Sequence, residues 1–183
     1  MASKRGLTLY SLLSDTLGKV VELDTNGISL DDVIKGFNCQ KMAREIGFTC
    51  VPENLWYETA EASIRADRRG TMTRFADCGE WIGRYVLAKS QSTNLTEQLV
   101  KCLTPLTSDA SEFSIEGSDT LRLRLVNPRL PPAYTEAFST LLVRAIGAIG
   151  YECETRNHTR GMILLEFRRA KGLDRQLRKE VFA

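Results

Sequence analysis

Residues 112–169 read EFSIEGSDTLRLRLVNPRLPPAYTEAFSTLLVRAIGAIGYECETRNHTRGMILLEFRR, and this stretch decides the fold. Apolar side chains recur at every second position in three segments of it: 121–125, 151–156 and 163–168. This alternation is typical of strands that bury one face. Residues 134–149 instead repeat apolar side chains at steps of three and four, which predicts a helix lying on a sheet.

The signals at the ends of these segments agree with their periods. Pro131 and Pro132 preset the backbone where the helix begins, and Gly150 follows it as a residue suited to a left-handed cap. Polar residues at 157–161 predict a hairpin loop, and a weaker run at 113–115 predicts a first short strand. The stretch is therefore predicted to fold as a β-β-α-β-β unit with an antiparallel sheet.

The chain before this unit has helical periodicity. Turn and cap signals divide it into predicted helices at about 7–23, 29–46, 52–64, 73–86 and 95–103. We predict one α+β domain over 1–183, in which a mainly helical layer, 1–106, packs on the sheet of the unit at 112–169. Residues 170–183 are predicted to form a basic amphipathic tail that docks on a partner, and the alternative is a tail that frays.

The amino-acid composition of the chain limits the classes of function that it can have. The chain has 183 residues, 43% of them hydrophobic, which is enough for one core, and its net charge of +2 creates no global field for nucleic acid or membranes. The N-terminus has no secretory apolar region and no run near the ~20 apolar residues of a membrane span. We therefore expect a cytoplasmic protein with no membrane span.

The residues that could carry catalysis or bind metal are few. The cysteines number five, are scattered and have no C-x-x-C spacing, so we expect reduced thiols, no metal site and no cofactor. The single histidine, His158, falls in the predicted hairpin loop, where a polar surface residue is the simpler interpretation. We therefore predict a non-catalytic protein. An enzyme, the alternative, would depend on His158.

Aromatic residues on the predicted helices suggest a ligand site. We predict that five of them line an apolar space between the helical layer and the sheet: Trp56, Phe75, Trp81, Tyr85 and Phe138. Such a space would hold an acyl chain or another small hydrophobic ligand. The alternative is a core that these side chains fill completely.

A basic cluster lies between the third and fourth predicted helices. It consists of Arg65, Arg68, Arg69 and Arg74. We predict that it can bind a phosphate or a lipid headgroup, and the alternative is a solvated loop.

Residues 40–58 allow a second interpretation of function. Ala43 and Gly47 match the first helix and turn of a helix-turn-helix, which would make the protein a DNA-binding transcriptional regulator. The second half fits less well, because Pro52 falls near the start of the recognition helix and Trp56 is not a typical base reader.

The order of helices followed by β-β-α-β-β resembles the superfamily that unites small core subunits of the TRAPP vesicle-tethering complex with sensor domains named after 4-vinyl reductase. Four segments carry the resemblance: 75–82, 125–128, 141–154 and 163–168. It implies a scaffold that assembles as a homodimer or with related subunits through exposed helices.

The functional marks of that superfamily are not all present. Acylated TRAPP subunits carry a cysteine just before the phenylalanine that opens the long helix, whereas residues 70–74 here contain none. The vinyl-reductase-type sensors often carry cysteines on both sides of the last hairpin, whereas only Cys153 is present here. The resemblance therefore implies no acylated cysteine and no metal at these positions.

Overall fold

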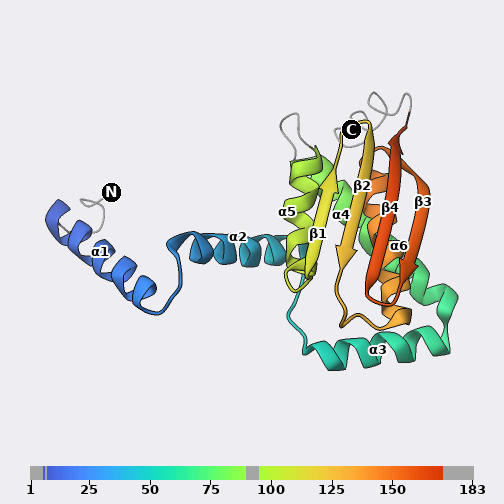
Figure 1. Cartoon of the computed structure of the whole chain (residues 1–183), viewed down its shortest axis with the longest axis horizontal. Helices are drawn as coiled ribbons and strands as arrows, with labels where there is room; N and C mark the ends of the chain where they lie inside the picture. The colour runs from blue at the N-terminus through green and yellow to red at the C-terminus, as the bar shows by residue number, and fades with distance from the viewer. Residues whose placement is uncertain (1–5, 7, 90–94, 171–183) are drawn as a thin grey trace. The chain divides into compact units, whose positions relative to one another are not determined.

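The computed structural model describes residue 6 and residues 8–89 and 95–170 (Figure 1). Contacts within the chain group it into two units, Met1–Lys41 and Met42–Ala183. Each unit is described by itself.

The first unit contains helix α1, Leu9–Thr25, and most of helix α2, Leu30–Ile46. Thr8 caps α1, because its hydroxyl oxygen accepts a hydrogen bond from the Ser11 amide at 3.1 Å. Ser29 caps α2 in the same way through the amide of Asp32, also at 3.1 Å. Helix α1 buries none of its residues.

The described part of the second unit holds four more helices: α3 (Glu53–Ala66), α4 (Arg68–Lys89), α5 (Leu95–Thr107) and α6 (Pro132–Ala148). Its strands are β1 (Glu112–Glu116), β2 (Thr120–Val126), β3 (Tyr151–Thr159) and β4 (Met162–Arg169). They form one antiparallel sheet in the order β1-β2-β4-β3. The predicted α+β class, with helices packed on an antiparallel sheet built by a β-β-α-β-β unit, is confirmed.

The core lies between one face of the sheet and the helices. Figure 1 shows α6 behind β3 and β4, and these elements are in contact. The predicted alternation holds in β2 and β4, where Leu123 pairs with Leu165 and both side chains are buried. From α6, Leu142 and Ile146 pack into the same core and are fully buried.

Helix α4 packs very closely on α6. A Cβ atom added at Gly79 would lie 2.1 Å from the carbonyl oxygen of Leu141, and one added at Gly83 would lie 2.5 Å from that of Ala145. The two backbones therefore touch at this crossing, and only glycine fits. This close approach fixes the position of α4, which carries part of the site described below.

Three predicted boundaries differ from the structure. Strand β3 runs to Thr159, so residues 157–159 are strand and the predicted loop is shorter. Helix α4 begins five residues before Thr73, at Arg68, because the Asp67 carboxylate accepts a hydrogen bond from the Gly70 amide at 2.8 Å and caps the helix. Helix α5 continues through Pro105 instead of stopping near residue 103.

Candidate functional site

An apolar cavity of about 670 Å³ lies within the second unit. Side chains from α3, α4 and α6 line it, together with residues 47–51 and the segment that joins α5 to β1. Its aromatic lining residues are Phe48, Trp56, Tyr57, Phe75, Tyr134 and Phe138. The volume lies within the range of roughly 300–1,000 Å³ that is common for small-molecule sites.

Tyr134 is at the centre of these rings. Its ring centroid lies 5.0 Å from that of Tyr57 and 5.9 Å from those of Phe75 and Phe138. The ring of Trp56 lies 6.1 Å away, edge to face. Tyr134 and Phe138 are four residues apart on α6, so they point the same way and stack, with their planes only 12° apart. Three helices thus contribute rings to one continuous aromatic wall.

Two of the predicted lining residues lie elsewhere. Trp56, Phe75 and Phe138 line the cavity, whereas Trp81 and Tyr85 do not. Trp81 is 55% exposed, and its indole nitrogen donates a hydrogen bond to the carbonyl oxygen of Ile46 at 3.3 Å.

The geometry of α4 explains this difference. At about 100° per residue, Trp81 lies roughly 240° around the helix from Phe75, so the two side chains face different surroundings. Tyr85 donates a hydrogen bond to the carboxylate of Glu45 at 2.8 Å. Phe48, Tyr57 and Tyr134 line the cavity but were not predicted to do so, although the four-residue spacing of Tyr134 and Phe138 placed both on one face of a helix.

One part of the cavity wall is polar. Glu53 and Asp109 both line the cavity, and both carboxylates contact the guanidinium of Arg129, at 3.2 Å and 2.9 Å. The side-chain amide of Asn127 donates a second hydrogen bond to Asp109 at 2.9 Å. The first residue of α3, the end of the α5–β1 joint and the loop after β2 are therefore held together at this point.

The phenols of the cavity are shifted in their acidity. Burial raises the pKa of Tyr57, a hydrogen bond to the Glu53 carboxylate raises it further, and the charges of Glu53 and Asp109 add to the effect. Burial also raises the pKa of Tyr134, and Asp109 acts in the same direction, whereas a hydrogen bond with Trp56 opposes it. Both hydroxyls therefore stay protonated at neutral pH, which keeps the aromatic part of the wall uncharged.

Two buried oxygen atoms of the lining residues have no hydrogen-bond partner among the described residues. One is the Oγ1 atom of Thr71, a residue that is 4% exposed, and the other is the Oε1 atom of Glu53. Buried polar atoms are nearly always paired, because an unpaired one loses its hydration without compensation. At these two atoms the cavity wall has hydrogen-bonding groups without a partner among the described residues.

Two thiols also line the cavity. Burial raises the pKa of Cys78, so its thiol stays protonated and is a poor nucleophile. Cys50 is exposed.

The predicted basic cluster is divided among different contacts. Arg65 lies 3.8 Å from the carboxylate of Glu61 one turn earlier, and Arg68 forms an ion pair with Glu136 on α6. Arg68 and Arg69 border a shallow hollow on α4, and Arg74 lines the aromatic cavity.

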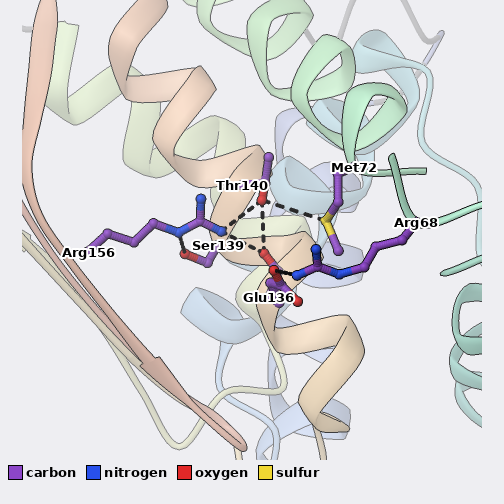
Figure 2. Close-up of polar contacts among 6 residues, drawn as sticks. All are labelled: Arg68, Met72, Glu136, Ser139, Thr140 and Arg156. Carbon is purple, nitrogen blue, oxygen red and sulfur yellow. Dashed lines mark hydrogen bonds and ion pairs between the residues drawn. The ribbon is translucent and has the colours of Figure 1, made fainter. Parts of the chain in front are cut away.

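Arg68 belongs to a polar network that ties three elements together, as Figure 2 shows. From β3, Arg156 donates hydrogen bonds to the hydroxyl of Ser139 at 2.9 Å and to that of Thr140 at 2.8 Å. It also donates to the main-chain carbonyl of Glu136 at 3.0 Å. The carboxylate of Glu136 binds Arg68, so the network joins β3 to α6 and α6 to α4. We assign it a structural role.

The remaining sequence predictions fall outside the cavity. His158 is exposed on β3, opposite Ile163 of β4, and does not line the cavity. Residues 47–52 separate α2 from α3, a longer connection than the roughly three- or four-residue turn of a helix-turn-helix. The predicted tail, 170–183, lies outside the described residues except for Ala170.

The described residues contain neither a metal-binding cluster nor a membrane-spanning helix. Nowhere in 8–89 and 95–170 do three histidine, cysteine, aspartate or glutamate side chains group as metal ligands would. Within the same ranges, every helix is too short or too polar to cross a bilayer. Comparisons with family models, with curated proteins and with solved structures gave no match.

Proposed function

We propose that the protein is a non-catalytic domain that binds a small hydrophobic molecule, such as one with an alkyl or acyl chain, in the aromatic cavity. The cavity itself is the observation that carries the proposal: about 670 Å³ of space, lined by six aromatic rings, five of them from three helices. A filled core would leave no such space. The cavity also combines a mainly apolar wall with a few clustered polar groups, which is typical of small-molecule sites.

The chemistry of the wall supports binding without turnover. The Cys78 thiol is held in its protonated form by burial, and the chain's one histidine lies outside the cavity. The carboxylates of Glu53 and Asp109 are engaged with Arg129. None of these groups is arranged as a nucleophile with a base beside it.

We further propose that the protein acts through assembly with a second copy of itself or with related subunits, in the cytoplasm. The resemblance to TRAPP subunits and vinyl-reductase-type sensors supports this, and so does the surface of α1. Leu9, Leu13, Leu17 and Val21 of that helix are all exposed. Replacing Leu13 and Leu17 by glutamate should convert a dimer into a monomer in sedimentation experiments, and a wild-type monomer would contradict the proposal.

Tryptophan fluorescence tests the ligand proposal, because Trp56 lines the cavity and Trp81 does not. In a Trp81→Phe variant, titration with 1-alkanols of eight to fourteen carbons should change the emission in a saturable way. Each buried CH₂ contributes about 0.8 kcal/mol, so the Kd should fall about fourfold per methylene until the cavity is full. The Trp56→Phe variant is the control and should show no change.

A second pair of variants tests whether the alkanol occupies the cavity. Ser63 lines it, whereas the neighbouring Ala62 on α3 is exposed and does not. Ser63→Phe should abolish binding by filling the space, and Ala62→Phe should leave it unchanged. Equal binding by both variants, or no binding by the Trp81→Phe protein, would overturn the proposal.

A further inference from the structure

The polar part of the cavity wall carries more negative than positive charge. Two carboxylates, those of Glu53 and Asp109, share the single guanidinium of Arg129. All three side chains are partly exposed, Arg129 by 55%, Asp109 by 40% and Glu53 by 38%, so water weakens each charge and weakens that of Arg129 most. A charged group entering the cavity beside these residues would therefore meet a net negative potential.

The same two carboxylates also act on the phenols of the cavity wall. Beyond the effect of burial, a hydrogen bond to Glu53 and the charges of Glu53 and Asp109 raise the pKa of Tyr57. Asp109 raises the pKa of Tyr134 as well, whereas a hydrogen bond with Trp56 lowers it. A negative group raises the pKa of a phenol because it opposes formation of the phenolate. The same opposition applies to any anionic group that a ligand places near these rings.

The Oε1 atom of Glu53 limits which polar group a ligand can place beside it. It is buried and has no hydrogen-bond partner of regular geometry among the described residues, whereas the other oxygen binds Arg129 and the Tyr57 hydroxyl lies close to the same carboxylate. A carboxylate oxygen can only accept a hydrogen bond. A ligand with an N–H or O–H group would complete this carboxylate, and a ligand carboxylate or phosphate would oppose it with a second acceptor.

Among the described residues that line the cavity, Arg74 alone carries a positive charge. Its side chain is exposed, so water satisfies its hydrogen bonds and screens its charge without any ligand. Leaving Arg74 without an anion costs nothing, whereas leaving a buried carboxylate oxygen unpaired is costly. The buried Oε1 atom of Glu53 therefore determines which polar group of a ligand the cavity favours.

We infer that the ligand of this cavity is an amphiphile whose polar group is a hydrogen-bond donor, neutral or positively charged, as in a long-chain alcohol or amine. Free fatty acids and acyl phosphates are selected against. This inference rests on the proposed function, because it concerns the polar group of the molecule that the cavity is proposed to bind.

Three ligands with the same chain test it: dodecylamine, which is protonated at neutral pH, 1-dodecanol and dodecanoate. Their affinities for the full chain are measured through Trp56 fluorescence in the Trp81→Phe variant, below the concentrations at which they form micelles. The amine should bind most tightly and dodecanoate least, with about a tenfold or larger ratio between the two Kd values. Dodecanoate binding as tightly as the amine would overturn the inference.

Glu53→Gln removes the charge and should reduce that ratio severalfold, mainly by weakening the amine. Glu61→Gln is the matched control, because Glu61 lies on the same helix, pairs with Arg65 and does not line the cavity. If Glu53→Gln unfolds, Asp109→Asn serves in its place, since Asp109 shares Arg129 with Glu53. An unchanged ratio in a folded variant would also overturn the inference.

These outcomes separate the two proposals. If dodecanol binds but dodecanoate is preferred over the amine, the proposed function stands and the inference about the polar group fails. If none of the three ligands binds, the proposed function fails, and this inference fails with it.

Discussion

Because the hydroxyl of Thr71 is unpaired, we predict that removing this polar group stabilises the protein. Thr71 is 4% exposed, and its Oγ1 atom has no partner among the described residues. Valine has nearly the same shape and is also branched at Cβ, so Thr71→Val removes the buried hydroxyl with little change in packing or helix propensity. An unpaired buried polar group costs about 1–3 kcal/mol. The substitution should therefore raise the free energy of unfolding by about 1–2 kcal/mol.

Thr135 provides the matched control, because it is a fully buried threonine of α6 whose hydroxyl is fully used. It donates a hydrogen bond to the carbonyl of Pro131 at 2.9 Å and accepts one from the amide of Gly161 at 3.2 Å. Thr135→Val leaves the buried Gly161 amide without that acceptor, so it should lower the free energy of unfolding by about 1–3 kcal/mol. The same chemical change is thus predicted to have opposite signs at the two positions.

Urea denaturation followed by circular dichroism measures both variants. The midpoint should rise for Thr71→Val and fall for Thr135→Val, with the slope unchanged. A loss of stability in Thr71→Val comparable to that in Thr135→Val would refute the reasoning, because it would mean that the Thr71 hydroxyl has a partner in solution. A bound water in the cavity would be such a partner.

Three further predictions follow from the packing and the titratable groups. Gly79→Ala should destabilise the protein by several kcal/mol because its Cβ would lie 2.1 Å from the Leu141 carbonyl, whereas Gly18→Ala, with nothing within 4 Å, should be neutral or stabilising in thermal melts. Arg156→Met should cost about 1–2 kcal/mol by removing three hydrogen bonds to α6. Because the pKa of Tyr57 is raised in the folded protein, its contribution to stability is complete below about pH 10 and is lost above it, and Tyr57→Phe should flatten this alkaline decline in urea midpoints.

The sheet and α6 could be predicted from the sequence because each buries one face. Apolar residues therefore recur with a period of two in the strands and of 3.6 in the helix. In β2, Leu121, Leu123 and Leu125 are buried and the arginines between them are exposed, as the alternation requires. Boundaries were less certain. The start of α4 depends on the Asp67 side chain as a cap, a signal that resembles an ordinary surface aspartate in the sequence.

The cavity could be predicted only in part, because aromatic residues on a helix can turn toward the core or away from it. Trp81 and Tyr85 belong to the same helix as Phe75, but they point to the carbonyl of Ile46 and the carboxylate of Glu45. The choice between these surroundings depends on contacts distant in sequence. The polar contacts of Arg129 depend on them too, since they join segments from three parts of the chain.

The aromatic side chains of α6 lie where this helix borders the cavity. Along the predicted apolar stripe of this helix, Leu142 and Ile146 are fully buried in the core. One to two turns earlier, Tyr134 meets the rings of α3 and α4, and Phe138, which also belongs to the core, stacks on Tyr134. Both rings line the cavity, where Trp56 remains 38% exposed. The apolar stripe of α6 therefore packs into the core at residues 142 and 146 and borders the cavity at residues 134 and 138. Substitutions at 142 and 146 should affect folding, whereas those at 134 and 138 should also affect ligand affinity.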